Sequence, residues 1–188
     1  MAANSDGQRA SAWLQAKSLP LAAVGAFVPA LDLEGMVDAT LRAGRSGEAA
    51  PEATLSLQGH GVRARPEGSE GSPAAELRID AGLAAGRVQG SARVDGADGT
   101  RLALHGDAPV SRDDGAAAVA ADLRWTGNVA SVAAVLPVGD ADVGGRMDAD
   151  LHLSGSLAVP RLSGRASLAG GSPNNLWVNI FNWIIVIM

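Results

Sequence analysis

The chain has 188 residues, a formal net charge of −5 and no cysteine, so it is long enough for one domain. The mild acidity excludes a basic footprint for nucleic acid, and the lack of cysteine excludes disulfides and thiolate metal sites. The only aromatic residues are four tryptophans and two phenylalanines. Because aromatic side chains bury the most area and anchor compact cores, this composition indicates a shallow or open architecture.

The first ten residues are predicted to be a flexible N-terminal segment. The stretch "SAWLQAKSLP" then has the spacing of a short helix, with Ser11 as N-cap and Pro20 as terminator. The apolar run that follows is interrupted by Pro20 and Pro29, so it does not have the continuous core of a signal peptide. If the protein is exported, we expect the export signal to be missing from this chain.

Strict alternation of apolar and polar residues over four to eight positions predicts half-buried strands. In "AELRIDAGL", for example, Leu77, Ile79 and Leu83 alternate with charged residues such as Arg78 and Asp80. Eight segments show this pattern: 36–44, 53–59, 75–83, 86–96, 100–106, 118–127, 147–154 and 162–168. Connections rich in Gly and Asp, such as "DGADGT", "SRDDG" and "RPEGSEGSP", are typical of hairpin turns. The prediction is therefore a mainly β, antiparallel fold.

A second break in the alternation is "NVASVAAVLP", where helical spacing begins at Asn128 and ends at Pro137. Trp13, Leu19-Pro20 and "GMVDATL" are echoed about 110 positions later by Trp125, Leu136-Pro137 and "GRMDADL". This repeat divides the chain into a first unit, 11–127, and the start of a second unit, 128–171. Residues 172–188 form an apolar tail of foreign composition, with four of the five isoleucines. This tail is excluded from the fold.

The second unit carries a recurring phrase of Leu-Pro, alternating Gly, Ala and Leu, and then Pro-x-Leu-x-Gly. It consists of Leu136, Pro137, Gly145, Met147, Ala149, Leu151, Leu153, Gly155, Leu157, Pro160, Leu162 and Gly164. This phrase resembles the repeats of the TamB family, the translocation and assembly module proteins among the AsmA-like inter-membrane bridges. The first unit departs from it, because "RAGRSGEAAPEATL" lacks the Leu-Ser-Gly turn.

The resemblance implies a curled antiparallel β-sheet, described as a β-taco or an open β-solenoid-like repeat, with one or two short helices. It implies a periplasmic protein whose full-length form is anchored in the inner membrane, by an anchor absent from this chain. The implied function is phospholipid transport to the outer membrane, or assembly and secretion of autotransporter-type proteins. The implied partners are phospholipid acyl chains, neighbouring repeats and an outer-membrane barrel of the Omp85 type. Neither a cofactor nor a catalytic residue is implied.

The resemblance implies a lipid-binding trough, and the alternation assigns the residues that would line it. They are Leu77, Ile79, Leu83, Val88, Val94, Leu102, Leu104, Leu123, Leu151, Leu153, Leu162 and Leu168. A closed β-solenoid or sandwich, acting as a structural or adhesive spacer without ligand, is the alternative. A truncated fragment without an independent role is another, and an enzyme ranks last because no nucleophile or metal site converges. Strand edges left open at either end of the sheet would invite aggregation.

The remaining polar residues are interpreted as surface positions. His60, His105 and His152 are far apart in the sequence, and a zinc site needs three or four converging ligands. Asp148 and Asp150 share a face, but general acid–base catalysis would also require a cleft that perturbs their pKa. We therefore expect solvent-exposed side chains at all five positions. Trp125 is expected to pack a short helix onto the sheet.

Overall fold

The computed structural model describes residues 9–25, 32–46, 49–65, 72–111, 115–129 and 145–170. Within these ranges the chain forms nine strands and one short helix. Their bounds are β1 Arg9–Pro20, α1 Leu21–Gly25, β2 Asp32–Ser46, β3 Glu52–Arg65, β4 Ala75–Ala84, β5 Arg87–Gly96, β6 Arg101–Pro109, β7 Ala120–Asn128, β8 Arg146–Gly155 and β9 Pro160–Ala169. No helix in these ranges is long and apolar enough to cross a membrane.

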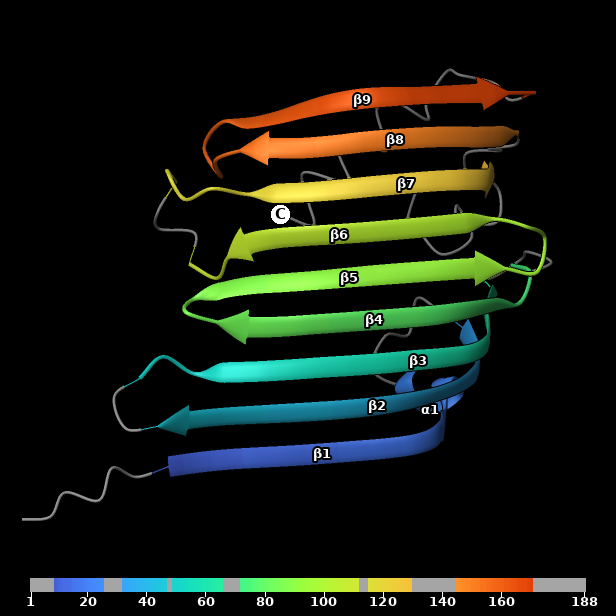
Figure 1. Cartoon of the computed structure of the whole chain (residues 1–188). Helices are drawn as coiled ribbons and strands as arrows, with labels where there is room; N and C mark the ends of the chain where they lie inside the picture. The colour runs from blue at the N-terminus through green and yellow to red at the C-terminus, as the bar shows by residue number, and fades with distance from the viewer. Residues whose placement is uncertain are drawn as a thin grey trace, which may run out of the picture.

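The nine strands form one antiparallel sheet whose spatial order is the order in the chain. Figure 1 shows the strands side by side in a single layer, with β1 at one edge and β9 at the other. The sheet is open, since its two edge strands do not pair with each other. The mainly β, antiparallel fold predicted from the alternation is thereby confirmed.

All eight predicted strands are present, but the helix predicted from Ser11 is wrong. These residues belong to β1, where Leu14 lies opposite Leu41 and Ala16 lies opposite Ala39. Helix propensity is a weak preference that tertiary context overrides. A second pattern, the alternation of Ala12, Leu14 and Ala16, matches the apolar positions of β2, and hydrogen bonding to that strand decides the outcome.

The first three strands are bent at neighbouring positions. The register shifts between Ala16 and Leu19 in β1, between Glu34 and Met36 in β2, and between Gly59 and Val62 in β3. Ser18, Gly35 and Gly61, which lie at these shifts, all have positive φ angles. Bulges bend a strand and increase its twist, and Figure 1 shows the ends of β1–β3 curving away from the viewer. The helix α1 follows this bend and lies against β2.

Two tight turns join the central strands. Between β4 and β5 the connection is Ala85-Gly86, with φ angles of 49° and 71°, as in a type I′ hairpin. Between β5 and β6, the predicted "DGADGT" turn is confirmed, with the N–H of Gly96 donating to the carbonyl of Thr100 at 2.7 Å. Asp98 also accepts from the Thr100 backbone N–H at 3.0 Å.

Several sequence-based assignments fall partly outside the described residues. The predicted helix at 128–136 is described only as far as Val129, and nothing of the tail at 172–188 is described. The flexible N-terminal segment was predicted to end at residue 10, but β1 begins at Arg9. The sheet continues without a break from the first predicted unit to the second, because β7 pairs with β8.

The two predicted repeat units share one backbone feature and differ in another. Gly35 and Gly145, which the repeat equates, both have positive φ angles, 116° and 112°. Trp13 and Trp125 were equated as well, but they lie on opposite faces of the sheet. Trp13 lies opposite Arg42, whereas Trp125 lies opposite apolar residues. This part of the proposed repeat is therefore wrong.

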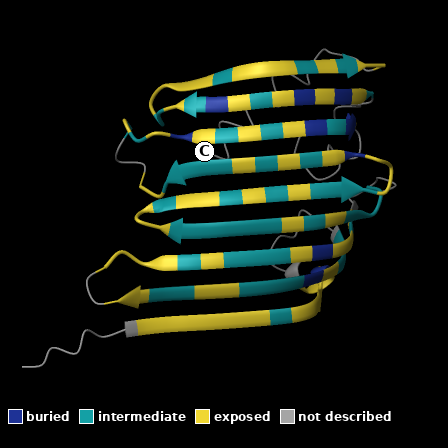
Figure 2. Ribbon diagram, in the orientation of Figure 1, coloured by how far each residue is buried: buried dark blue, intermediate teal, exposed yellow. Residues whose placement is uncertain are grey.

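The buried core is small and lies toward one edge of the sheet. Its main cluster consists of Trp125, Val129, Met147 and Ala149, which belong to β7, its end and β8; Leu21 and Val37 are buried separately, at α1 and β2. Figure 2 shows that buried residues gather in β7 and β8, whereas β1 is almost entirely exposed. Trp125 packs against Val129, the residue that follows β7.

Candidate functional site

The pairing register gathers the apolar positions of all nine strands on one face of the sheet, which we call the apolar face. Directly opposite residues on antiparallel strands point to the same face; Leu57, for example, lies opposite Ile79. Two uninterrupted rows of such residues cross the sheet. One row is Ala16, Ala39, Leu57, Ile79, Ala92, Leu104, Leu123, Leu151 and Gly164, and the other is Leu19, Val37, Gly59, Leu77, Val94, Leu102, Trp125, Ala149 and Ala166.

All twelve residues predicted to line a trough lie on this apolar face. Ten of them are half-buried, Val88 is exposed, and Leu153 is buried. They are Leu77, Ile79 and Leu83 of β4, Val88 and Val94 of β5, Leu102 and Leu104 of β6, Leu123 of β7, Leu151 and Leu153 of β8, and Leu162 and Leu168 of β9. The six strands therefore contribute to one continuous surface.

The exposure of the apolar face changes from one edge of the sheet to the other. Leu14 of β1 is 64% exposed and Leu41 of β2 is 40% exposed. On β7 and β8, by contrast, Trp125 and Met147 are only 5% and 2% exposed. Val37 of β2, at the bend, is 4% exposed. Apolar side chains are thus accessible at Leu14 and Leu41, whereas they are buried at Val37 and toward β8.

Four small residues form a short row in the middle of the apolar face, over β4 to β7, and leucines of β3 and β8 continue the row on either side. Gly90 and Gly106 lie opposite each other, between Ala81 of β4 and Ala121 of β7. On β4 and β6, larger residues such as Leu83 and Leu104 occupy the neighbouring rows. The floor of the apolar face is therefore lower along this row than on either side of it.

The backbone does not require glycine at these two positions. A Cβ atom added at Gly106 would lie 3.6 Å from the Cβ of Ala121, and one at Gly90 would lie 3.6 Å from that of Ala81. Both distances are ordinary van der Waals contacts, and neither glycine has a positive φ angle. Glycine in a strand interior costs stability and can mark a site where a ligand approaches closely.

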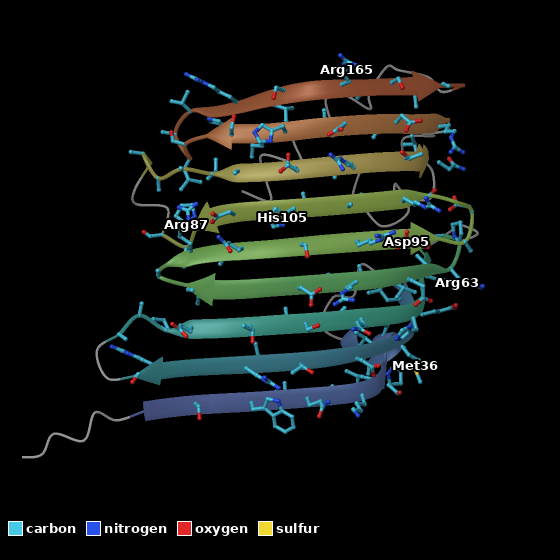
Figure 3. The ribbon with its side chains drawn as sticks, viewed as in Figure 1. Met36, Arg63, Arg87, Asp95, His105 and Arg165 are labelled. Atoms are coloured by element: carbon cyan, nitrogen blue, oxygen red, sulfur yellow. The ribbon has the colours of Figure 1, made fainter. Side chains whose placement is uncertain are left out.

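The opposite face of the sheet is polar and carries pairs of charged residues. Arg87 lies 2.9 Å from Asp107, and Arg93 lies 2.7 Å from Asp95. Figure 3 shows this polar face, with Arg87, Asp95 and His105 over β5 and β6. Exposed pairs contribute little to stability, but they keep this face hydrated. The two faces of the sheet are thus chemically distinct.

Several carboxylates on the polar face have lowered pKa values because they accept hydrogen bonds. The Arg87 side chain lowers the pKa of Asp107, and Arg93 lowers the pKa of Asp95. The backbone N–H of Gly61, which donates at 3.1 Å, lowers the pKa of Glu76. All these shifts favour the ionised form, as a solvated surface requires.

The three histidines are exposed, as predicted. His60 Nδ1 lies 2.7 Å from Glu76, and His152 Nδ1 lies 2.8 Å from Asp122. Within the described ranges, no group of three or more His, Asp or Glu residues could hold a metal ion. Both histidine contacts lie on the polar face and away from the apolar one.

Asp148 and Asp150 are also exposed, which confirms their assignment to a solvated face. The Thr126 hydroxyl donates to Asp148 at 2.7 Å, and Arg124 lies 3.6 Å from Asp150. Trp125 packs against Val129, next to these strands. Its indole Nε1 is buried and has no hydrogen-bond partner in the described part of the chain.

Part of the apolar face was not predicted from the sequence. Leu14 belongs to it, but the helix predicted for its segment concealed its alternation with polar neighbours. Leu41 and Leu55 lie in the predicted strand segments 36–44 and 53–59, yet they were left out of the predicted lining. They lie opposite each other and continue the face toward β1. Trp125 was treated as a packing residue and lies on the same face.

We compared the chain with protein-family models, with curated proteins and with solved structures, and none of these comparisons found a match.

Proposed function

We propose that this chain binds phospholipid acyl chains along the apolar face, as a segment of a TamB-like envelope protein. The observation that carries the proposal is the register, which aligns apolar residues across nine antiparallel strands of an open sheet. A large exposed apolar patch on a soluble protein usually marks a binding surface. Leu14, Leu41 and Val88 leave this face accessible on three strands.

The energy of burying an acyl chain is large enough for this role. Each methylene removed from water contributes ~0.8 kcal/mol, so a sixteen-carbon chain contributes on the order of 12 kcal/mol when fully buried. Hydrophobic attraction is non-directional. A chain could therefore slide along the rows instead of binding at one point. Such a conduit uses neither a catalytic residue nor a cofactor.

The wider role rests on the resemblance to TamB repeats. In that role, the apolar face is one segment of a periplasmic bridge anchored in the inner membrane by another part of the protein. Phospholipid moves along the bridge toward the outer membrane. Assembly and secretion of outer-membrane proteins with a barrel of the Omp85 type is the companion role. Neighbouring repeats of the same protein are the further partners in this role.

A closed structural spacer is the second candidate function. The observation that favours it is the buried cluster on β7 and β8, where Trp125, Met147 and Ala149 pack together with Val129. At this end the apolar face is occupied by the protein's own side chains. In a spacer the whole face would be packed in this way, and no lipid would bind.

Lipid content after purification separates the two functions. The whole chain, expressed in a bacterial periplasm, would be analysed by native mass spectrometry and by lipid extraction. We expect co-purified phospholipid, and we expect Leu102→Asp with Leu104→Asp to remove it, because buried carboxylates are costly next to an acyl chain. A folded, lipid-free wild-type monomer would favour the spacer and overturn the conduit.

Ala103→Asp is the matched control. Ala103 lies between the two leucines on β6, but it is exposed on the polar face, opposite Arg93 and Arg124. A carboxylate there gains two cationic neighbours and leaves the apolar face unchanged. Its lipid content should equal that of the wild type. Equal loss of lipid in the control and in the leucine variants would assign the loss to net charge or to misfolding.

A further inference from the structure

The edge strand β1 offers an unpaired backbone edge. On one side it pairs with β2, residue for residue from Arg9 to Ala16. On its other side, no strand of the described part of the chain pairs with it. An exposed, long and regular edge strand is a template for pairing with another chain.

The side chains of β1 are exposed on both faces of the sheet. Trp13 is 62% exposed on the polar face, and Leu14 is 64% exposed on the apolar face. Single exposed apolar residues are common on protein surfaces. Here, however, two of them are adjacent, point to opposite faces and share one open edge. A strand added to this edge would cover both at once.

The other edge strand, β9, is less suited to pairing. Gly164, in the middle of β9, has a φ angle of 132°. Arg161 and Arg165 occupy exposed positions on its polar face. Irregular backbone and charged side chains are devices that protect sheet edges. The edge available for pairing is therefore that of β1.

We propose that β1 pairs in antiparallel orientation with β1 of a second copy of this chain, with Leu14 opposite Leu14. This register pairs Ala12 with Ala16, Trp13 with Gln15 and Ser11 with Lys17 of the other copy. The largest β1 side chain on the apolar face, Leu14, meets its own copy, and no two cations are opposed. The register of β1 shifts between Ala16 and Leu19, and Ser18 has a positive φ angle. Regular pairing around Leu14 therefore covers Ala12 to Ala16 of each copy.

Symmetry makes this dimer a closed assembly. The two-fold axis is perpendicular to the sheet at Leu14, so the apolar faces of both copies lie on the same side. The pairing is isologous and uses the β1 edge of both copies, so it stops at two. Pairing of β1 with β9 of another copy would instead be heterologous and would build fibres. The dimer joins two nine-stranded sheets into one.

A single cysteine tests both the edge and the register. The chain contains no cysteine, so Leu14→Cys in the whole chain creates one thiol per copy. Directly opposite residues on antiparallel strands have Cα atoms roughly 4.5–5.5 Å apart, within the range that a disulfide spans. We expect a disulfide-linked dimer on a non-reducing gel. Leu162→Cys, on β9, should give none, and cross-linking at Trp13→Cys but not at Leu14→Cys would overturn the register.

The mass in solution tests the dimer without cross-linking. Size-exclusion chromatography with light scattering, over a range of concentrations, should show a monomer–dimer equilibrium. Leu14→Lys places like charges opposite each other and should raise the dissociation constant at least about tenfold, whereas Leu162→Lys should leave it unchanged. A wild-type monomer at all concentrations, or fibres sensitive to Leu162→Lys, would overturn the proposal. Lipid-free protein is used, so the result does not depend on the proposed lipid binding.

Discussion

The row of small residues on the apolar face gives the most direct prediction about lipid binding. Valine at Gly90 and Gly106 would place side chains along this row, while leaving the backbone unstrained. The added Cβ atoms would make only ordinary contacts, at 3.4 Å or more. The perturbation therefore fills space above the sheet and does not disturb the fold beneath it.

Each valine should stabilise the fold but weaken lipid binding. Glycine in a strand interior costs roughly 0.5–1 kcal/mol, so each valine should raise the free energy of unfolding by about that amount. In the bound state, each valine places three carbon atoms where an acyl chain would lie. Losing contact for about three methylenes costs ~2.4 kcal/mol, or roughly fiftyfold in affinity per substitution. The variant should therefore be more stable and bind lipid more weakly.

Gly82→Val is the control for this experiment. Gly82 also lies inside β4, but its partners Thr54 and Gln89 place it on the polar face. An added Cβ there has only the Ala53 carbonyl oxygen, at 4.0 Å, nearby. The control should gain the same stability and keep the affinity of the wild type.

The assay is a titration of each protein with phosphatidylcholine that carries one fluorescent acyl chain. Urea unfolding, followed by circular dichroism, supplies the stabilities. Equal affinities for the Gly90→Val, Gly106→Val and Gly82→Val proteins would refute the idea that a chain follows this row. Loss of stability in the Gly106→Val protein would refute the claim that the position has free space.

Three further predictions concern the fold. Ala85→Gly should raise the free energy of unfolding in urea by about 1 kcal/mol, because a left-handed alanine is strained; an unchanged midpoint would contradict this. Gly164→Ala should lower the free energy of unfolding by more than about 2 kcal/mol, since the added Cβ would collide with the carbonyl oxygen of Asp150. Wild-type thermal stability would contradict this. The pKa of Asp107 is lowered by Arg87. The stabilisation of the fold by the ionised Asp107 carboxylate is therefore fully present above the unfolded pKa of about 3.9, and it is lost as pH falls through the folded pKa. Asp107→Asn should therefore weaken the dependence of stability on pH between about pH 5 and pH 2, and an unaltered dependence would contradict this.

Local alternation was enough to predict most of the sheet. In β4, Leu77, Ile79, Ala81 and Leu83 occupy every second position, and the side chains of a strand point to alternate faces. Their shared face therefore followed from the sequence, as did the hydrated face of Asp148 and Asp150. The Gly- and Asp-rich turns between strands indicated antiparallel pairing for the same local reason.

Only the tertiary structure decided the positions where two local patterns compete. The segment around Leu14 is compatible with a helix and with a strand, and pairing to β2 selects the strand. Trp13 and Trp125 look equivalent in the sequence, but their partners across the strands place them on opposite faces. The pairing partners are distant in the chain, so local periodicity carries no information about them.

The same distinction holds for the candidate site. The sequence by itself determined that each strand has an apolar side, because that property depends on neighbouring residues. The tertiary structure decided that these sides align across nine strands, that Gly90 and Gly106 meet in one row, and that Trp125 is buried while Leu14 is exposed. Register and burial are set by contacts between residues far apart in the chain, and only the folded sheet brings those residues together.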